Sequence, residues 1–170
     1  GVTVTQTTRF PETDATRLAG AAARPARWTL MLRRPAWCAG MTVAVNGRRV
    51  RASPDAAGYL AVARTWREGD VVDVRLPMTL RAEPLPNAPE LVAFAYGPIV
   101  LAGALGTAGV TPSAQIIKNE RESGNMLNAA VEIPALAGTA ADVVRATRRV
   151  SDAPLAFETA GVGRPRDVRL

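Results

Sequence analysis

The feature that most constrains this chain is a series of short alternating segments between residues 27 and 76. Apolar side chains recur there at every second position, as in strands that bury one face. Asn46-Gly47 separates two of these segments and signals a tight hairpin, because both turn positions need positive φ. The predicted inward residues are Trp28, Leu30, Leu32, Val43, Val45, Leu60, Val62, Val72, Val74 and Leu76.

The turn signals recur roughly every 8–12 residues, a spacing typical of antiparallel sandwiches. We therefore predict an all-β fold: an antiparallel β-sandwich, with two consecutive sandwich units. A proline-rich segment, Pro84–Pro89, predicts a stiff bridge and divides the chain into residues 1–88 and 89–170. The second unit is predicted to be a partial sandwich with a long loop near residues 104–130.

Within the second unit, Leu91–Ala102 is apolar at both odd and even positions, broken by Gly97-Pro98. A strand that is apolar on both faces must be covered on both, for example by a neighbouring module. Val131–Leu136 and Leu155–Thr159 read as further strands. Ala140–Val150 fits either a strand or one or two helical turns.

The chain contains no histidine and one cysteine, Cys38. Serine triads, histidine-ligated zinc and histidine general bases are therefore excluded within these residues, and so is a four-cysteine metal site. Cys38 follows an apolar segment and is read as a small half-buried residue, since a nucleophilic role would need a neighbouring base. The acidic residues show no spacing that marks a catalytic pair. We predict no catalytic residue, no cofactor and no metal.

The net charge of +6 comes almost entirely from arginine, scattered in short clusters along the chain. Arginine-rich, Ala-, Gly- and Pro-rich usage indicates a GC-rich genome, and no aromatic-basic RNA motif or recognition helix accompanies it. We therefore predict neither a nucleic-acid nor a membrane partner, and expect a soluble chain. No apolar segment has transmembrane length, and no signal peptide is visible at Gly1, which leaves the compartment open.

Several motifs occur in a fixed order along nearly the whole chain. They are Thr8–Pro11, Leu32–Trp37 with Val43–Gly47, Gly58–Leu60 with Arg64–Asp70 and Leu76–Met78, Ala95–Gly103, and Pro154–Phe157 with Gly161–Pro165. As an ordered set they resemble the C-terminal β-sandwich region of the β-L-arabinofuranosidase family of glycoside hydrolases (family 127 and its relatives).

The resemblance implies an N-terminal (α/α)₆ barrel that performs catalysis in the parent protein, followed by β-sandwich domains. The family's active site is implied to use a cysteine nucleophile, a zinc held by cysteines and a glutamate, and a carboxylic acid/base. All of these belong to the barrel, and no position in this sequence matches their motifs. Relatives continue past Leu170, so the second sandwich would be incomplete. The resemblance therefore implies a non-catalytic accessory region of a glycoside hydrolase that packs against a catalytic barrel.

Large aromatic side chains offer the remaining functional candidates. Trp37, Trp66 and Tyr59 are the residues that could contact a carbohydrate, since an exposed ring can stack on a sugar face. Core packing is the competing interpretation for each of them. Two further functions stay open beside the accessory role: a carbohydrate-binding module for plant-derived polysaccharide, and a protein-binding sandwich with no carbohydrate role.

Overall fold

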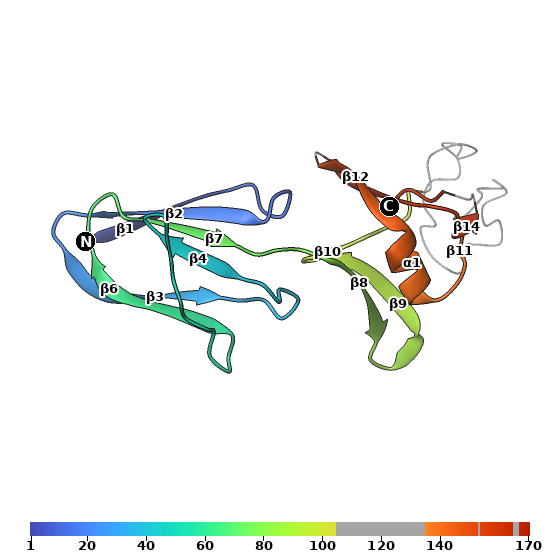
Figure 1. Cartoon of the computed structure of the whole chain (residues 1–170), viewed down its shortest axis with the longest axis horizontal. Coiled ribbons are helices and arrows are strands. Elements are labelled where there is room, and N and C mark those ends of the chain that lie inside the picture. Colours follow the sequence, from blue (N-terminus) through green and yellow to red (C-terminus); the bar gives the residue numbers. More distant parts are fainter. Residues whose placement is uncertain (105–134, 153, 165–166) are drawn as a thin grey trace, which may run out of the picture. The chain divides into compact units, whose positions relative to one another are not determined.

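The computed structural model of the chain describes residues 1–104, 135–152, 154–164 and 167–170 (Figure 1). It consists of two compact units, Gly1–Val100 with Asp152–Pro154, and Leu101–Ser151 with Leu155–Leu170. Antiparallel strands dominate both, and the predicted all-β, sandwich-like fold is confirmed. The division into domains at residues 88 and 89 stays a prediction.

The first unit begins with a two-layer sandwich (Figure 1). One layer is a five-stranded antiparallel sheet in the order β1-β2-β7-β4-β5, and the other is the antiparallel pair β3-β6. The strands of the larger sheet are β1 (Val2–Thr8), β2 (Ala15–Ala22), β4 (Thr42–Val45), β5 (Arg48–Arg49) and β7 (Val71–Arg75). The smaller sheet consists of β3 (Ala26–Arg33) and β6 (Tyr59–Trp66).

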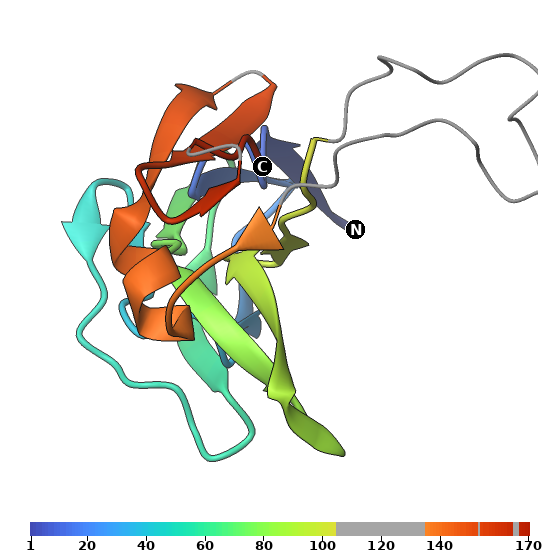
Figure 2. The same ribbon diagram turned by 90° about the vertical axis from the view of Figure 1, so that its right-hand side faces the viewer.

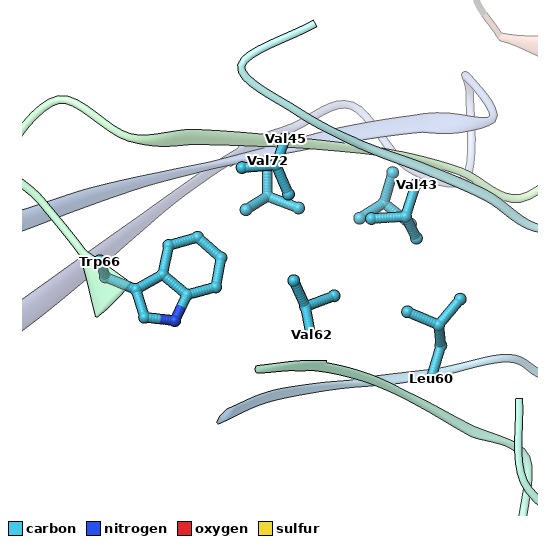
Figure 3. Close-up of a cluster of buried hydrophobic side chains, with 7 residues drawn as sticks. Val43, Val45, Leu60, Val62, Trp66 and Val72 are labelled. Atoms are coloured by element: carbon cyan, nitrogen blue, oxygen red, sulfur yellow. The ribbon is translucent and has the colours of Figure 1, made fainter. Parts of the chain in front are cut away.

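The core of the sandwich lies between these two sheets (Figure 3). Its buried members alternate along their strands with exposed residues, so the period-2 pattern of the sequence sets which face is inward. Leu18, Trp28, Leu30, Leu32 and Leu76 pack against this cluster and are partly buried. All of the predicted inward positions are confirmed. The buried set is Val43, Val45, Leu60, Val62, Trp66, Val72 and Val74.

The predicted hairpin at Asn46-Gly47 joins β4 to β5. Both residues have positive φ, 50° and 76°, as a two-residue turn of this kind requires. Strands β1 and β2, by contrast, lie outside the predicted set. Every residue of β1 is exposed, and β2 is built largely from alanine and glycine, so neither strand shows strong apolar alternation.

A separate three-stranded sheet, β10-β9-β8, follows the sandwich. Its strands are β8 (Leu80–Leu85), β9 (Ala88–Tyr96) and β10 (Ile99–Val100). Pro84–Pro89, predicted to be a bridge between domains, is instead the tip of the β8–β9 hairpin. Pro84 is tolerated because β8 is an edge strand of the described sheet and its register with β9 shifts between Pro84 and Leu85.

The described residues of the second unit form two short strand pairs and one helix (Figure 2). The capping box of Thr139 and Asp142 starts the helix. Residues 140–150, left open between helix and strand, form both in succession. The predicted strand Leu155–Thr159 is confirmed, whereas residues 131–134 and nearly all of the predicted loop lie outside the described residues. The elements are β11 (Ala135–Leu136), α1 (Ala140–Ala146), β12 (Thr147–Asp152), β13 (Leu155–Thr159) and β14 (Gly163–Arg164).

Candidate functional site

Two stacked indole rings, those of Trp28 and Trp66, lie in the sandwich core. The rings of Trp28 and Trp66 lie 4.9 Å apart between centroids, with an interplanar angle of 27°. Trp66 Nε1 donates a hydrogen bond to the Trp28 backbone carbonyl at 3.1 Å. Trp66 is only 5% exposed. Its ring therefore supports the core and offers little surface to a sugar.

A charged network borders this pair. The guanidinium of Arg64 lies 5.1 Å from the Trp66 ring centroid, within cation–π range, and its Nη2 is 3.4 Å from Asp70 Oδ2. Asp70 Oδ1 accepts a hydrogen bond of 2.6 Å from Asn46 Nδ2, and Oδ2 accepts one of 2.8 Å from the Arg67 backbone N–H. One nearly buried carboxylate thus holds the β4–β5 turn and the β6–β7 turn together.

These contacts lower the pKa of Asp70 below the usual aspartate value. The hydrogen bond from Asn46 contributes most, followed by the backbone hydrogen bond from Arg67, and burial opposes them. The group is therefore ionised and fully engaged. A general acid or base needs a raised pKa or an open approach, and this carboxylate has neither.

The other two candidate aromatics lie in different surroundings. Trp37 is half-buried and stacks on Phe10, with 6.3 Å between ring centroids and an interplanar angle of 13°. Tyr59 is 38% exposed at the start of β6, opposite Arg33. The structure thus ties Trp66 to Trp28 and Trp37 to Phe10, and leaves Tyr59 on the surface. Carbohydrate contact by any of the three stays a prediction.

A shallow groove of about 570 Å³ is lined by residues of β1, β2 and β7 and of the β1–β2 connection. Two of its lining residues, Arg17 and Asp73, form an ion pair of 2.7 Å between neighbouring strands, and Arg75 pairs with Asp14 at 3.1 Å. Threonines from β1 and β2 form much of the remaining lining, and no aromatic ring is among its lining residues. The paired charges and the missing stacking platform make this a polar sheet surface without a catalytic arrangement.

Cys38, the only thiol of the chain, is fully buried. Its backbone N–H donates to the Pro35 carbonyl at 3.0 Å, within the loop between β3 and β4. A substrate has no access to this sulfur in the folded chain. No cluster of three or more His, Cys, Asp or Glu side chains that could hold a metal occurs within the described ranges. In the same part of the chain, no helix has the length and apolar character needed to cross a membrane.

Comparison with known proteins relates the sandwich to a protein family. Residues 1–78, which contain both sheets and their core, match the family model described as the GH127 middle domain of beta-L-arabinofuranosidase. This match supports the assignment of residues 1–78 to the GH127 family. The family resemblance of the sequence motifs is thereby confirmed, and the matched residues end just before β8.

Solved structures agree with this assignment. A GH127 beta-L-arabinofuranosidase from Geobacillus stearothermophilus T6 is 33% identical with a TM-score of 0.54, over 58% of this chain and 16% of that one. A glycoside hydrolase is 30% identical with a TM-score of 0.53, over 58% and 17%. A GH127 beta-arabinofuranosidase is 31% identical with a TM-score of 0.51, over 58% and 19%. No curated protein matches the chain. The chain spans less than a fifth of the length of these solved relatives.

Sequence reasoning missed the residues that organise this sandwich, because most of them look ordinary one at a time. Asp70 reads as a turn residue and Arg64 as one of many arginines. Asn46 lies in the motif Val43–Gly47, and Arg64 and Asp70 lie in the motif Arg64–Asp70. The ordered set of motifs was therefore the sequence signal that could have identified these residues.

Proposed function

We propose that this chain is a non-catalytic accessory region of a GH127-type glycoside hydrolase, and that it packs against the catalytic barrel of the parent polypeptide. The match of residues 1–78 to the GH127 middle domain is the observation that carries the proposal. The region shared with this chain makes up only 16–19% of the enzymes it resembles, so their chemistry has room to lie elsewhere.

The chemistry of the chain supports the non-catalytic part of the proposal. It has no histidine. Its thiol is buried, and the carboxylates Asp14, Asp70 and Asp73 are each paired with an arginine. We expect the purified chain to leave an aryl β-L-arabinofuranoside unhydrolysed. Release of the aryl group above a buffer blank, retained after repurification, would refute this part.

A domain graft tests the packing role. In the Geobacillus stearothermophilus enzyme, the segment that matches residues 1–78 would be replaced by residues 1–78 of this chain. We expect the chimera to keep most of its activity and its thermal midpoint, because the replacement brings the same sandwich. The matched control replaces the segment with an unrelated sandwich of equal length. If both chimeras lose activity and stability equally, the proposed docking role is wrong.

Carbohydrate binding is the second candidate, favoured only by the exposed ring of Tyr59 and the half-buried Trp37. Calorimetric titration with plant polysaccharides distinguishes it from the accessory role. Heat that disappears in both Tyr59→Ala and Trp37→Ala would support binding. Flat titrations of the wild-type chain would remove this candidate.

A further inference from the structure

The two layers of the sandwich differ in width. Five strands form one sheet, whereas only β3 and β6 form the other. The buried side chains of β6 meet those of β7 and β4, and the inward side chains of β3 pack beside Leu18 of β2. No described strand therefore covers β1. Its inward residues Val2 and Val4 are 45% and 47% exposed as a result.

A narrow gap between the sheets marks this uncovered edge. Its lining includes Val2 and Val4 of β1, Leu18 of β2, and Trp28 and Leu30 of β3. The gap measures about 20 Å³, roughly the space of one water molecule, so it is too small for a sugar or a cofactor. It is the open side of an apolar core, which a further inward-facing side chain would close.

Two sets of polar groups at this edge lack partners. Strand β3 pairs only with β6 among the described residues, so its other edge presents unpaired backbone N–H and C=O groups. The Nε1 of Trp28 is buried and has no hydrogen-bond partner in the described part of the chain. A buried donor without an acceptor is costly, and a strand carbonyl alongside β3 would supply one.

The charge of β3 indicates which strand would fit. Arg27 and Arg33 are exposed on its outward face, opposite Thr65 and Tyr59 of β6, so neither has a carboxylate across the strand pair. Residues 15–54 contain no Asp or Glu at all. Opposite charges on neighbouring strands stabilise their pairing, whereas a second copy of β3 would bring arginine against arginine.

We propose that the free edge of β3 accepts one further β-strand, an extended peptide with apolar side chains at alternate positions and carboxylates on its outward face. Its backbone pairs with β3, one of its carbonyls accepts from Trp28 Nε1, and its inward side chains cover Val2 and Val4. This is recognition by strand addition, with the main chain giving affinity and alternate side chains giving specificity. It does not depend on the proposed role in a GH127 enzyme.

Titration of the full chain with the synthetic peptide TVEVTVEVT tests the proposal by NMR. We expect a saturable downfield shift of the Trp28 indole N–H, assigned from its loss in Trp28→Phe. The controls are TVKVTVKVT, which reverses the charge, and TTVVEEVVT, which has the same composition without alternation. Both should bind at least fivefold more weakly. Trp28→Phe should weaken TVEVTVEVT about fivefold, the equivalent of one neutral hydrogen bond, and Trp37→Phe should not.

Three results would overturn the proposal. The first is an unchanged Trp28 indole resonance at millimolar peptide. The second is equal affinity for the alternating and the rearranged peptide, which would indicate unspecific apolar contact. The third is a concentration-dependent dimer without peptide that shows the same indole shift, since a second copy would then occupy the edge.

Discussion

Replacing Asp70 by asparagine is the sharpest test of what holds the sandwich turns together. The carboxylate accepts from Asn46 Nδ2 on one oxygen and from the Arg67 N–H on the other. Asn46 cannot simply rotate its amide, because its Oδ1 already accepts from the Val71 N–H at 2.9 Å. Either orientation of a new amide therefore places an NH₂ group against a donor.

The expected loss follows from this geometry. Asp70→Asn removes one hydrogen bond to a charged acceptor, worth about 1.5–3 kcal/mol, and also the attraction to Arg64. Since Asp70 is only 7% exposed, solvent screens these contacts little. We expect the free energy of unfolding to fall by about 2–3 kcal/mol. The control Asp73→Asn breaks a single exposed pair with Arg17 and should cost about 0.2–1 kcal/mol.

Urea unfolding followed by tryptophan fluorescence measures the difference. All three tryptophans lie in residues 1–78, so the signal reports the sandwich alone. The pKa of Asp70 is lowered in the folded state, so the unfolded chain binds its proton more readily. The contribution of Asp70 is therefore complete at neutral pH and declines as the pH falls below about 4–5. Equal losses for the two variants at pH 7, or a gap that widens in acid, would refute the reasoning.

Three further predictions concern packing and access. Leu60→Ala should lower the free energy of unfolding by about 2–5 kcal/mol, because Leu60 is 3% exposed, whereas Met31→Ala on the outward face should cost about 0.5 kcal/mol or less in the same urea titration. Gly97→Ala should lower the thermal midpoint, since its φ is 55° and an added Cβ would lie 2.5 Å from the Met78 side chain; an unchanged calorimetric midpoint would contradict this. Cys38 should react with a thiol reagent only on unfolding, so rapid colour development in native buffer would show that the loop opens.

The sandwich was predictable where side-chain alternation carries it. In β6 and β7 the inward positions hold Leu60, Val62, Val72 and Val74, and all four are buried. The same rule fails for β1, whose inward valines are exposed because none of the described strands covers them. Apolar alternation reports burial, so a strand at an uncovered edge gives a weak pattern even though its backbone pairs fully with β2.

The proline-rich hairpin shows a second limit. Proline lowers the expectation of a strand because it removes a backbone donor, which is why Pro84–Pro89 predicts a bridge. An edge strand can tolerate that loss, since its outer side has no partner to donate to. Whether a strand lies at an edge is a property of the sheet, which the local sequence does not contain.

Long-range contacts limited the prediction of the candidate site in the same way. Trp37, Trp66 and Tyr59 were chosen by residue type, yet their exposure depends on which residue lies opposite. Trp66 is covered by Trp28, 38 positions away in the sequence, and Tyr59 faces outward only because Leu60 takes the inward position. The parity of β6 places Tyr59 and Trp66 on opposite faces, seven positions apart, so one continuous strand cannot present both rings to one sugar. A carbohydrate role would therefore have to rest on Tyr59 and Trp37, and the burial of Trp66 assigns that ring to the core.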